Sequence, residues 1–161
     1  MRLFNRKKEK LKSVQNDNVL DEFSQELFNN AEACVEQFKD RFGNGLDFTE
    51  KSLKLVDEIL DELSDFYPEM EEVQQKSIIN SIGSYIFEVA RRNFGGKYFW
   101  FDQRNQPILV TGQPNFEISI IVFDKVEGRI INGKEDSIPY FFEGYSERVR
   151  NAKGGDKATI V

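Results

Sequence analysis

Apolar positions along this chain fall into long stretches spaced for helices and one short block spaced for strands. From Leu20 to Phe42 they recur every three or four residues, which is typical of a helix with one buried face. The same spacing predicts helices over residues 46–68, 69–94, 123–132 and 137–149. Asp47 and Glu50 fit a capping box at the start of the second helix. Gly83, within the third, predicts close packing against another backbone.

Three short segments between the third and fourth helices have the composition of strands: residues 97–101, 107–111 and 116–122. We therefore predict the α+β class, with helices packed on a small three-stranded antiparallel sheet in a single domain over residues 15–150. We expect residues 1–14 to be a basic flexible tail and residues 151–161 a flexible C-terminal tail, because neither segment has a core-facing period.

Both faces of the predicted sheet are apolar. Alternation places Tyr98, Trp100 and Leu109 on one face, and Phe99, Phe101 and Val110 on the other. If the second group fills the core beneath the helices, the first needs another cover. We therefore expect a homodimer or a protein partner on that face, with Trp100 as its anchor.

Composition narrows the chemistry. The 161 residues include no histidine, which excludes His-dependent triads and His-liganded zinc. The sole cysteine, Cys34, lies on the buried stripe of the first helix and is expected to be a core residue without a base to activate it. We predict no metal and no cofactor. Without a signal peptide or an apolar run long enough to span a membrane, the expected location is the cytoplasm.

Charge is distributed unevenly. Residues 1–12 carry six cations against Glu9, a local charge of +5, although the whole chain carries -6. The remaining 149 residues therefore carry -11, and such an acidic body disfavours nucleic acid as a partner. The basic segment is expected to be solvated, and weak contact with an anionic membrane surface remains open.

The stretch RRNFGGK, residues 91–97, could be a phosphate-binding loop or a helix end. A phosphate loop leads from a strand into a helix, whereas this stretch follows a helix, whose C-terminal dipole repels anions. Gly95 and Gly96 instead suit a left-handed cap. Arg91 and Arg92 complement the dipole, and Glu88 can pair with either.

An acidic run on the second helix contains Asp57, Asp61 and Asp65 on one face. The usual reading is a solvated face, and the functional alternative is attraction of a basic partner. The aromatic strand, residues 98–101, could stack nucleobases, but the negative body favours a packed strand.

Three segments resemble a widespread group of small bacterial proteins of unknown function. They are LDFTEKSLKLVDEIL (46–60), SIGSYIFEVARRNFGGKYFW (81–100) and FDKVEGRIINGKEDSIPYFF (123–142). The middle segment is similar to the group's pattern G-x-Y-x-G-E-x-x-x-R-x-x-G-G-x-W. It departs from that pattern at Phe87, which replaces the second glycine, and at Trp100, which comes later than the tryptophan of the pattern. The resemblance implies no activity and no functional residues.

These observations predict a non-enzymatic protein–protein interaction module, comparable to small acidic proteins that neutralise or regulate another protein. The alternative is a small-molecule-binding protein or an enzyme that uses carboxylate and arginine residues at the sheet edge. The candidate binding residues are Glu88, Arg91, Arg92, Tyr98, Trp100 and Asp102.

Overall fold

The computed structural model describes residues 22–161. Residues 22–37 are helical and lead into the short helix α2 (Lys39–Phe42). The 3-10 turn η1 (Glu50–Ser52) opens α3 (Leu53–Leu63), and η2 (Tyr67–Glu69) precedes the long α4 (Glu72–Phe94). After the strands follow α5 (Phe123–Asn132), η3 (Gly133–Asp136) and α6 (Ile138–Arg150). Within residues 22–161 the helical regions predicted from apolar spacing are confirmed, and the first is interrupted at Phe38 before α2 begins. Its predicted start at Leu20 lies outside the described residues.

The sheet contains β1 (Lys97–Phe101), β2 (Gln106–Thr111), β3 (Glu117–Ile120) and β4 (Lys157–Ile160), in that order. The first three strands are antiparallel neighbours, as predicted. The prediction of a three-stranded sheet is wrong, because β4 pairs in parallel with β3. This fourth strand lies in the segment for which we expected a flexible tail. It forms where Ile121 N can donate to Ile160 O at 2.9 Å.

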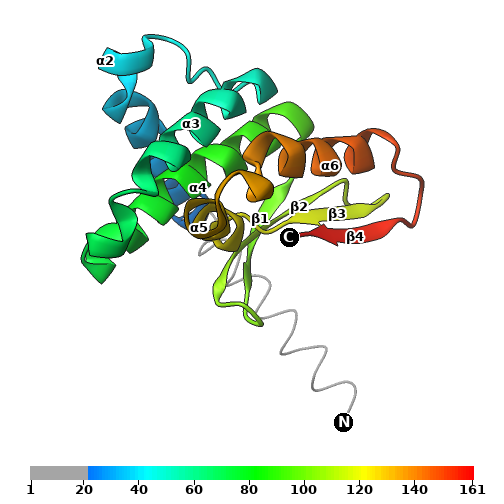
Figure 1. Ribbon diagram of the computed structural model, residues 1–161. Coiled ribbons are helices and arrows are strands. Elements are labelled where there is room, and N and C mark those ends of the chain that lie inside the picture. The colour runs from blue at the N-terminus through cyan, green and yellow to red at the C-terminus, as the bar shows by residue number, and fades with distance from the viewer. Residues whose placement is uncertain (1–21) are drawn as a thin grey trace.

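One face of the sheet packs against α4 and α6, and α3 packs in turn on α5 and α6 (Figure 1). A contact between β2 and α6 illustrates this packing: the Thr111 hydroxyl lies 2.7 Å from the Tyr145 hydroxyl. The strand residues in the main core are Tyr98, Leu109, Ile118 and Ile120. Burial of this continuous apolar layer is the main stabilising term of the fold.

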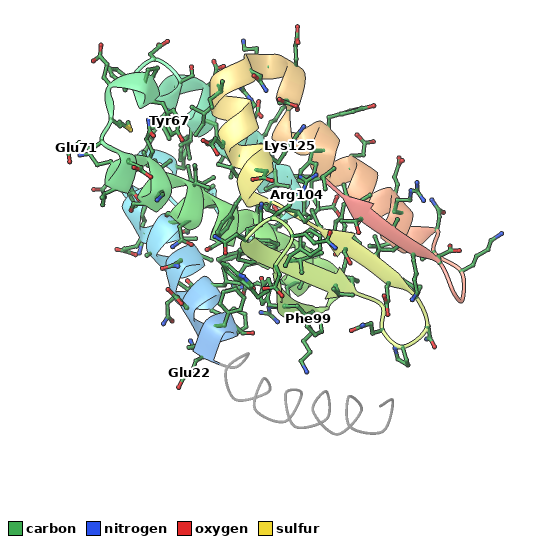
Figure 2. All side chains as sticks on the ribbon, turned by 90° about the horizontal axis from the view of Figure 1, so that it is seen from below. Glu22, Tyr67, Glu71, Phe99, Arg104 and Lys125 are labelled. Carbon is green, nitrogen blue, oxygen red and sulfur yellow. The ribbon has the colours of Figure 1, made fainter. Side chains whose placement is uncertain are left out.

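The face assignment from the sequence is therefore inverted. Tyr98 and Leu109 fill the core, whereas Phe99, Phe101 and Val110 lie on the opposite face and are partly exposed. Alternation correctly separated the two groups, but it could not say which group faces the helices. Figure 2 looks onto this opposite face and labels Phe99.

Two local predictions are corrected. Thr49, rather than an Asp47–Glu50 capping box, caps η1 by accepting Ser52 N at 3.3 Å, while Asp47 accepts from the Thr49 hydroxyl at 2.6 Å. Gly83 makes room for a side chain rather than a backbone, because a β-carbon there would overlap the ring of Phe123.

Gly95 ends α4, as predicted for the stretch RRNFGGK, but with an extended ψ at positive φ rather than in the left-handed helical conformation. Its φ of 75° and ψ of -176° suit glycine alone, and its N–H donates to Arg91 O at 2.8 Å. Its own carbonyl accepts the Thr111 hydroxyl at 2.8 Å, which fixes the helix end to β2. The glycines therefore form a cap leading into β1.

Candidate functional site

The candidate residues Glu88, Arg91, Arg92 and Tyr98 form one cluster between the last turns of α4 and the start of β1. Glu88 is fully buried. Its Oε2 accepts Arg91 Nε at 2.7 Å and the Tyr98 hydroxyl at 2.8 Å. Its Oε1 accepts Arg91 Nη2 at 3.0 Å and Arg92 Nε at 3.2 Å. Both carboxylate oxygens are therefore occupied by charged or phenolic donors.

Helical spacing creates this cluster, because residues three and four positions after Glu88 return to its side of α4. Residues outside α4 also contact the two arginines. Arg91 lies over the ring of Phe28 with its Cζ 4.5 Å from the centroid, and Arg92 lies over Phe48 at 3.6 Å. Arg92 Nη2 also donates to Glu32 at 2.8 Å. The cluster thus joins the first helix, the segment before η1, α4 and β1.

The environment shifts the pKa values of the partners away from neutral pH. Burial, and then the charge of Glu88, raises the pKa of Tyr98. Hydrogen bonds to Glu88 raise the pKa of Arg91. For Arg92, burial favours loss of the proton, but hydrogen bonds to Glu32 and Glu88 outweigh it and raise the pKa. Tyr98 therefore stays neutral and the arginines stay charged, so none of the three exchanges protons near neutral pH.

The other two candidate residues lie apart from this cluster. Trp100 is 48% exposed at the rim of the helix-covered face, where its ring meets Phe23 edge-on at 5.9 Å between centroids. Asp102 lies in the exposed turn after β1, where its carbonyl accepts Asn105 N at 3.3 Å. The structure brings four of the six candidates together, and their hydrogen bonds satisfy the buried Glu88 and Tyr98 while Arg91 and Arg92 reach the surface.

A second buried charge was missed in the sequence. Arg129 of α5 is 1% exposed and donates to Asp57 through Nε at 2.9 Å and Nη2 at 3.1 Å. The same Nη2 reaches Asp61 at 3.1 Å. Asp57 also accepts the N–H of Ile138 at 3.0 Å, so it joins α3 to the start of α6.

The prediction of a solvated acidic run is therefore wrong for Asp57, whose side chain is 22% exposed, whereas Asp61 pairs with Arg129 and stays 46% exposed. Hydrogen bonds to Asp57, and then to Asp61, raise the pKa of Arg129. A sequence signal was present, because Arg129 falls between Val126 and Ile130 on the buried side of α5. A buried cation at such a position needs carboxylate partners, and the acidic run is rich in carboxylates.

Beyond Asp61, the acidic run does reach the surface. Residues 57–73 contain eight carboxylates and no lysine or arginine. The ion pairs within residues 22–161 use Asp57, Asp61, Glu62 and Glu72 of this set. The others are exposed, and so are two apolar side chains between them, Phe66 at 63% and Val73 at 77%. We call the exposed residues Glu58, Glu62, Asp65, Phe66, Glu69, Glu71, Glu72 and Val73 the acidic corner.

The acidic corner lies where α3 ends and α4 begins. Gln75 Nε2 donates to Tyr67 O at 2.8 Å, which holds the start of α4 against η2. Figure 2 shows Tyr67 and Glu71 at one end of the molecule, away from Phe99. The acidic corner and the outward face of the sheet are therefore separate surfaces.

Charged side chains beside α5 are paired. Arg104 meets Asp124 at 3.2 Å, and Lys125 meets Asp136 at 2.7 Å (Figure 2). They line a shallow hollow of about 280 Å³. Because each cation already has a carboxylate partner, this hollow offers little to an anionic ligand.

Within residues 22–161, no group of three or more carboxylate or thiol side chains is placed to hold a metal ion. In the same part of the chain, no helix has the length and apolar character needed to cross a membrane. Comparison with protein-family models, curated proteins and solved structures finds no match for this chain.

Proposed function

We propose that this protein is a non-enzymatic protein–protein interaction module whose partner presents a basic surface. The acidic corner carries this proposal. It combines exposed carboxylates with two exposed apolar side chains, and such apolar side chains supply binding energy while complementary charge supplies rate and specificity. A module that neutralises or regulates a basic protein would need this combination.

The satisfied state of Glu88 supports a binding role over catalysis. A general base needs a free lone pair directed at a substrate, whereas both oxygens of Glu88 are occupied by its own neighbours. The network around Glu88 joins four segments of the chain, which suits a structural role. We therefore favour the interaction module over an enzyme built on these residues. Membership in the bacterial group suggested by the sequence stays a proposal.

The test compares charge variants in partner capture. The natural chain and a variant with Asp65→Lys and Glu69→Lys are immobilised separately and exposed to extract of the source cell. Captured proteins are then identified by mass spectrometry. We expect a basic protein that the natural chain retains and the variant loses. Its affinity should fall steeply as salt rises, because exposed charges are screened.

A matched control changes the same number of charges elsewhere, with Glu143→Lys and Glu147→Lys on the exposed side of α6. This control should retain the partner. Phe66→Ser, which keeps every charge, should weaken binding through lost apolar contact. Equal loss in both charge variants would indicate only general attraction to an acidic protein and would overturn the proposal.

A further inference from the structure

The sheet face turned away from α4 and α6 has a mixed character. Phe99 and Ile108 are register partners at its centre, and Phe101 and Val110 flank them. Phe99, Phe101 and Val110 are partly exposed, whereas Ile108 is buried. Near one end, Lys157 and Glu117 pair across β4 and β3 at 3.7 Å. We call these six residues the outer sheet face.

Charge indicates what can cover this face. Residues 13–161 carry -11, so two copies of the chain repel each other over most relative orientations. The outer sheet face, by contrast, carries charges of both signs around an apolar centre. In a two-fold arrangement, Lys157 of one copy can approach Glu117 of the other, and the reverse pair forms by symmetry.

The chain's own basic segment is a poorer match. Residues 1–12 carry +5, whereas the Lys157–Glu117 pair gives the outer sheet face no net charge. The acidic corner would therefore attract that segment more strongly. A self-complementary surface fits a second copy better.

We propose that the outer sheet face binds a second copy of this chain, forming a two-fold dimer with sheets packed face to face. Packed sheets lie about 10 Å apart and interdigitate their side chains. Phe99, Phe101 and Val110 of each copy would then form the apolar contact, with the exchanged Lys157–Glu117 pairs at its edge. This interface lies apart from the acidic corner, so each dimer would present two acidic corners.

Sedimentation equilibrium of the full chain tests this proposal. We expect the natural chain to be dimeric and Val110→Lys to raise the dimer dissociation constant at least about tenfold, because it places two cations in an apolar interface. Circular dichroism should show unchanged helix content, since Val110 lies outside the helix-side core. Trp100→Ser, on the other side of the sheet, is the matched control and should remain dimeric.

Charge exchange supplies the second measurement. Lys157→Glu alone should weaken the dimer because it faces Glu117 of the other copy, and adding Glu117→Lys should restore it. A natural chain that is monomeric at high concentration would overturn the proposal. So would a dimer that survives Val110→Lys, or a double exchange that fails to restore association. Loss of the basic partner in the capture experiment would leave this result unaffected.

Discussion

A cation buried on the apolar side of a helix needs anionic partners, and those of Arg129 connect α5 with α3 and α6. Asp57 and Asp61 supply the negative charge from α3, while Asp57 also receives the first N–H of α6. The cost of burying a guanidinium is offset only while these acceptors remain. Arg129 therefore holds α3 and α5 in one register.

Replacing Arg129 with methionine tests this role. The change keeps the bulk of the side chain but leaves Asp57 and Asp61 without their cation. Because both aspartates keep some contact with water, we expect the free energy of unfolding to fall by about 3 kcal/mol, the lower end for a broken buried pair. Urea unfolding gives the value. Asp61→Asn, at the more exposed partner, should cost about 1 kcal/mol or less. Similar losses in both variants would contradict the ranking of Asp57 over Asp61.

The buried thiol of Cys34 and the buried phenol of Tyr145 determine how stability changes at high pH. Burial raises the pKa of Cys34 from 9.0 to about 11 and that of Tyr145 from 10.0 to about 12. The folded chain thus retains protons that the unfolded chain releases above pH 9. This stability is fully present below pH 9 and is lost as the pH rises through the folded values.

We therefore predict that the free energy of unfolding is lower at pH 10.5 than at pH 8, by about 1 kcal/mol or more. Urea titrations at the two pH values measure the difference. Cys34→Ala should make the decline smaller, because the thiol is the first of these groups to titrate in the unfolded chain. A flat profile in the natural protein would show that the thiol and phenols titrate alike in both states.

At the scale of elements, the end of α4 joins a helix to a sheet through two glycines. Gly95 has φ at 75° with open space around its α-carbon, while Gly96 has φ at 130° and no such space. A β-carbon on Gly96 would lie 2.8 Å from Val110 O and from the Thr111 hydroxyl. Gly95 is required only for its positive φ, whereas Gly96 is required both for its positive φ and because a β-carbon would not fit.

We predict that Gly95→Ala costs about 1 kcal/mol and that Gly96→Ala costs more, because the neighbouring backbone of β2 cannot move aside cheaply. Thermal or urea unfolding of the two variants ranks them. Gly154→Ala, where nothing lies near the α-carbon and the backbone is ordinary, serves as the control and should be close to neutral. A larger cost at Gly95 than at Gly96 would contradict this account.

The sequence predicted the helices and the first three strands because each has a local signal. Apolar spacing marks the helices, and β-branched or aromatic runs mark the strands. The fourth strand has only four residues, and its pairing with Glu117 to Ile120 depends on a partner some forty positions earlier. Such long-range parallel pairing leaves little trace in the local pattern.

At the scale of the whole molecule, the candidate site could be predicted only where its contacts are local in the sequence. Glu88, Arg91 and Arg92 were grouped correctly because helical spacing is local. The contact of Glu88 with Tyr98 could also be predicted, because only the cap at Gly95 separates α4 from β1. The partners of Arg129 lie about seventy positions away, and which sheet face the helices cover is set by how every element packs. Only the fold supplies those contacts.

The basic segment, residues 1–12, lies outside the described residues, and its expected behaviour follows from its sequence alone. Six cations with only scattered apolar residues offer no core-facing period, so removing residues 1–14 should leave the thermal midpoint unchanged within a few degrees. Scanning calorimetry of the full and shortened chains compares the midpoints. A large drop would mean that Leu3 and Phe4 pack on the body. The shortened chain, which loses six cations and one carboxylate, should also bind a basic partner more tightly at low salt, because a basic segment would compete for the acidic corner. If instead the full chain alone binds vesicles of anionic lipid, the segment is a membrane-surface contact and its charge serves that purpose.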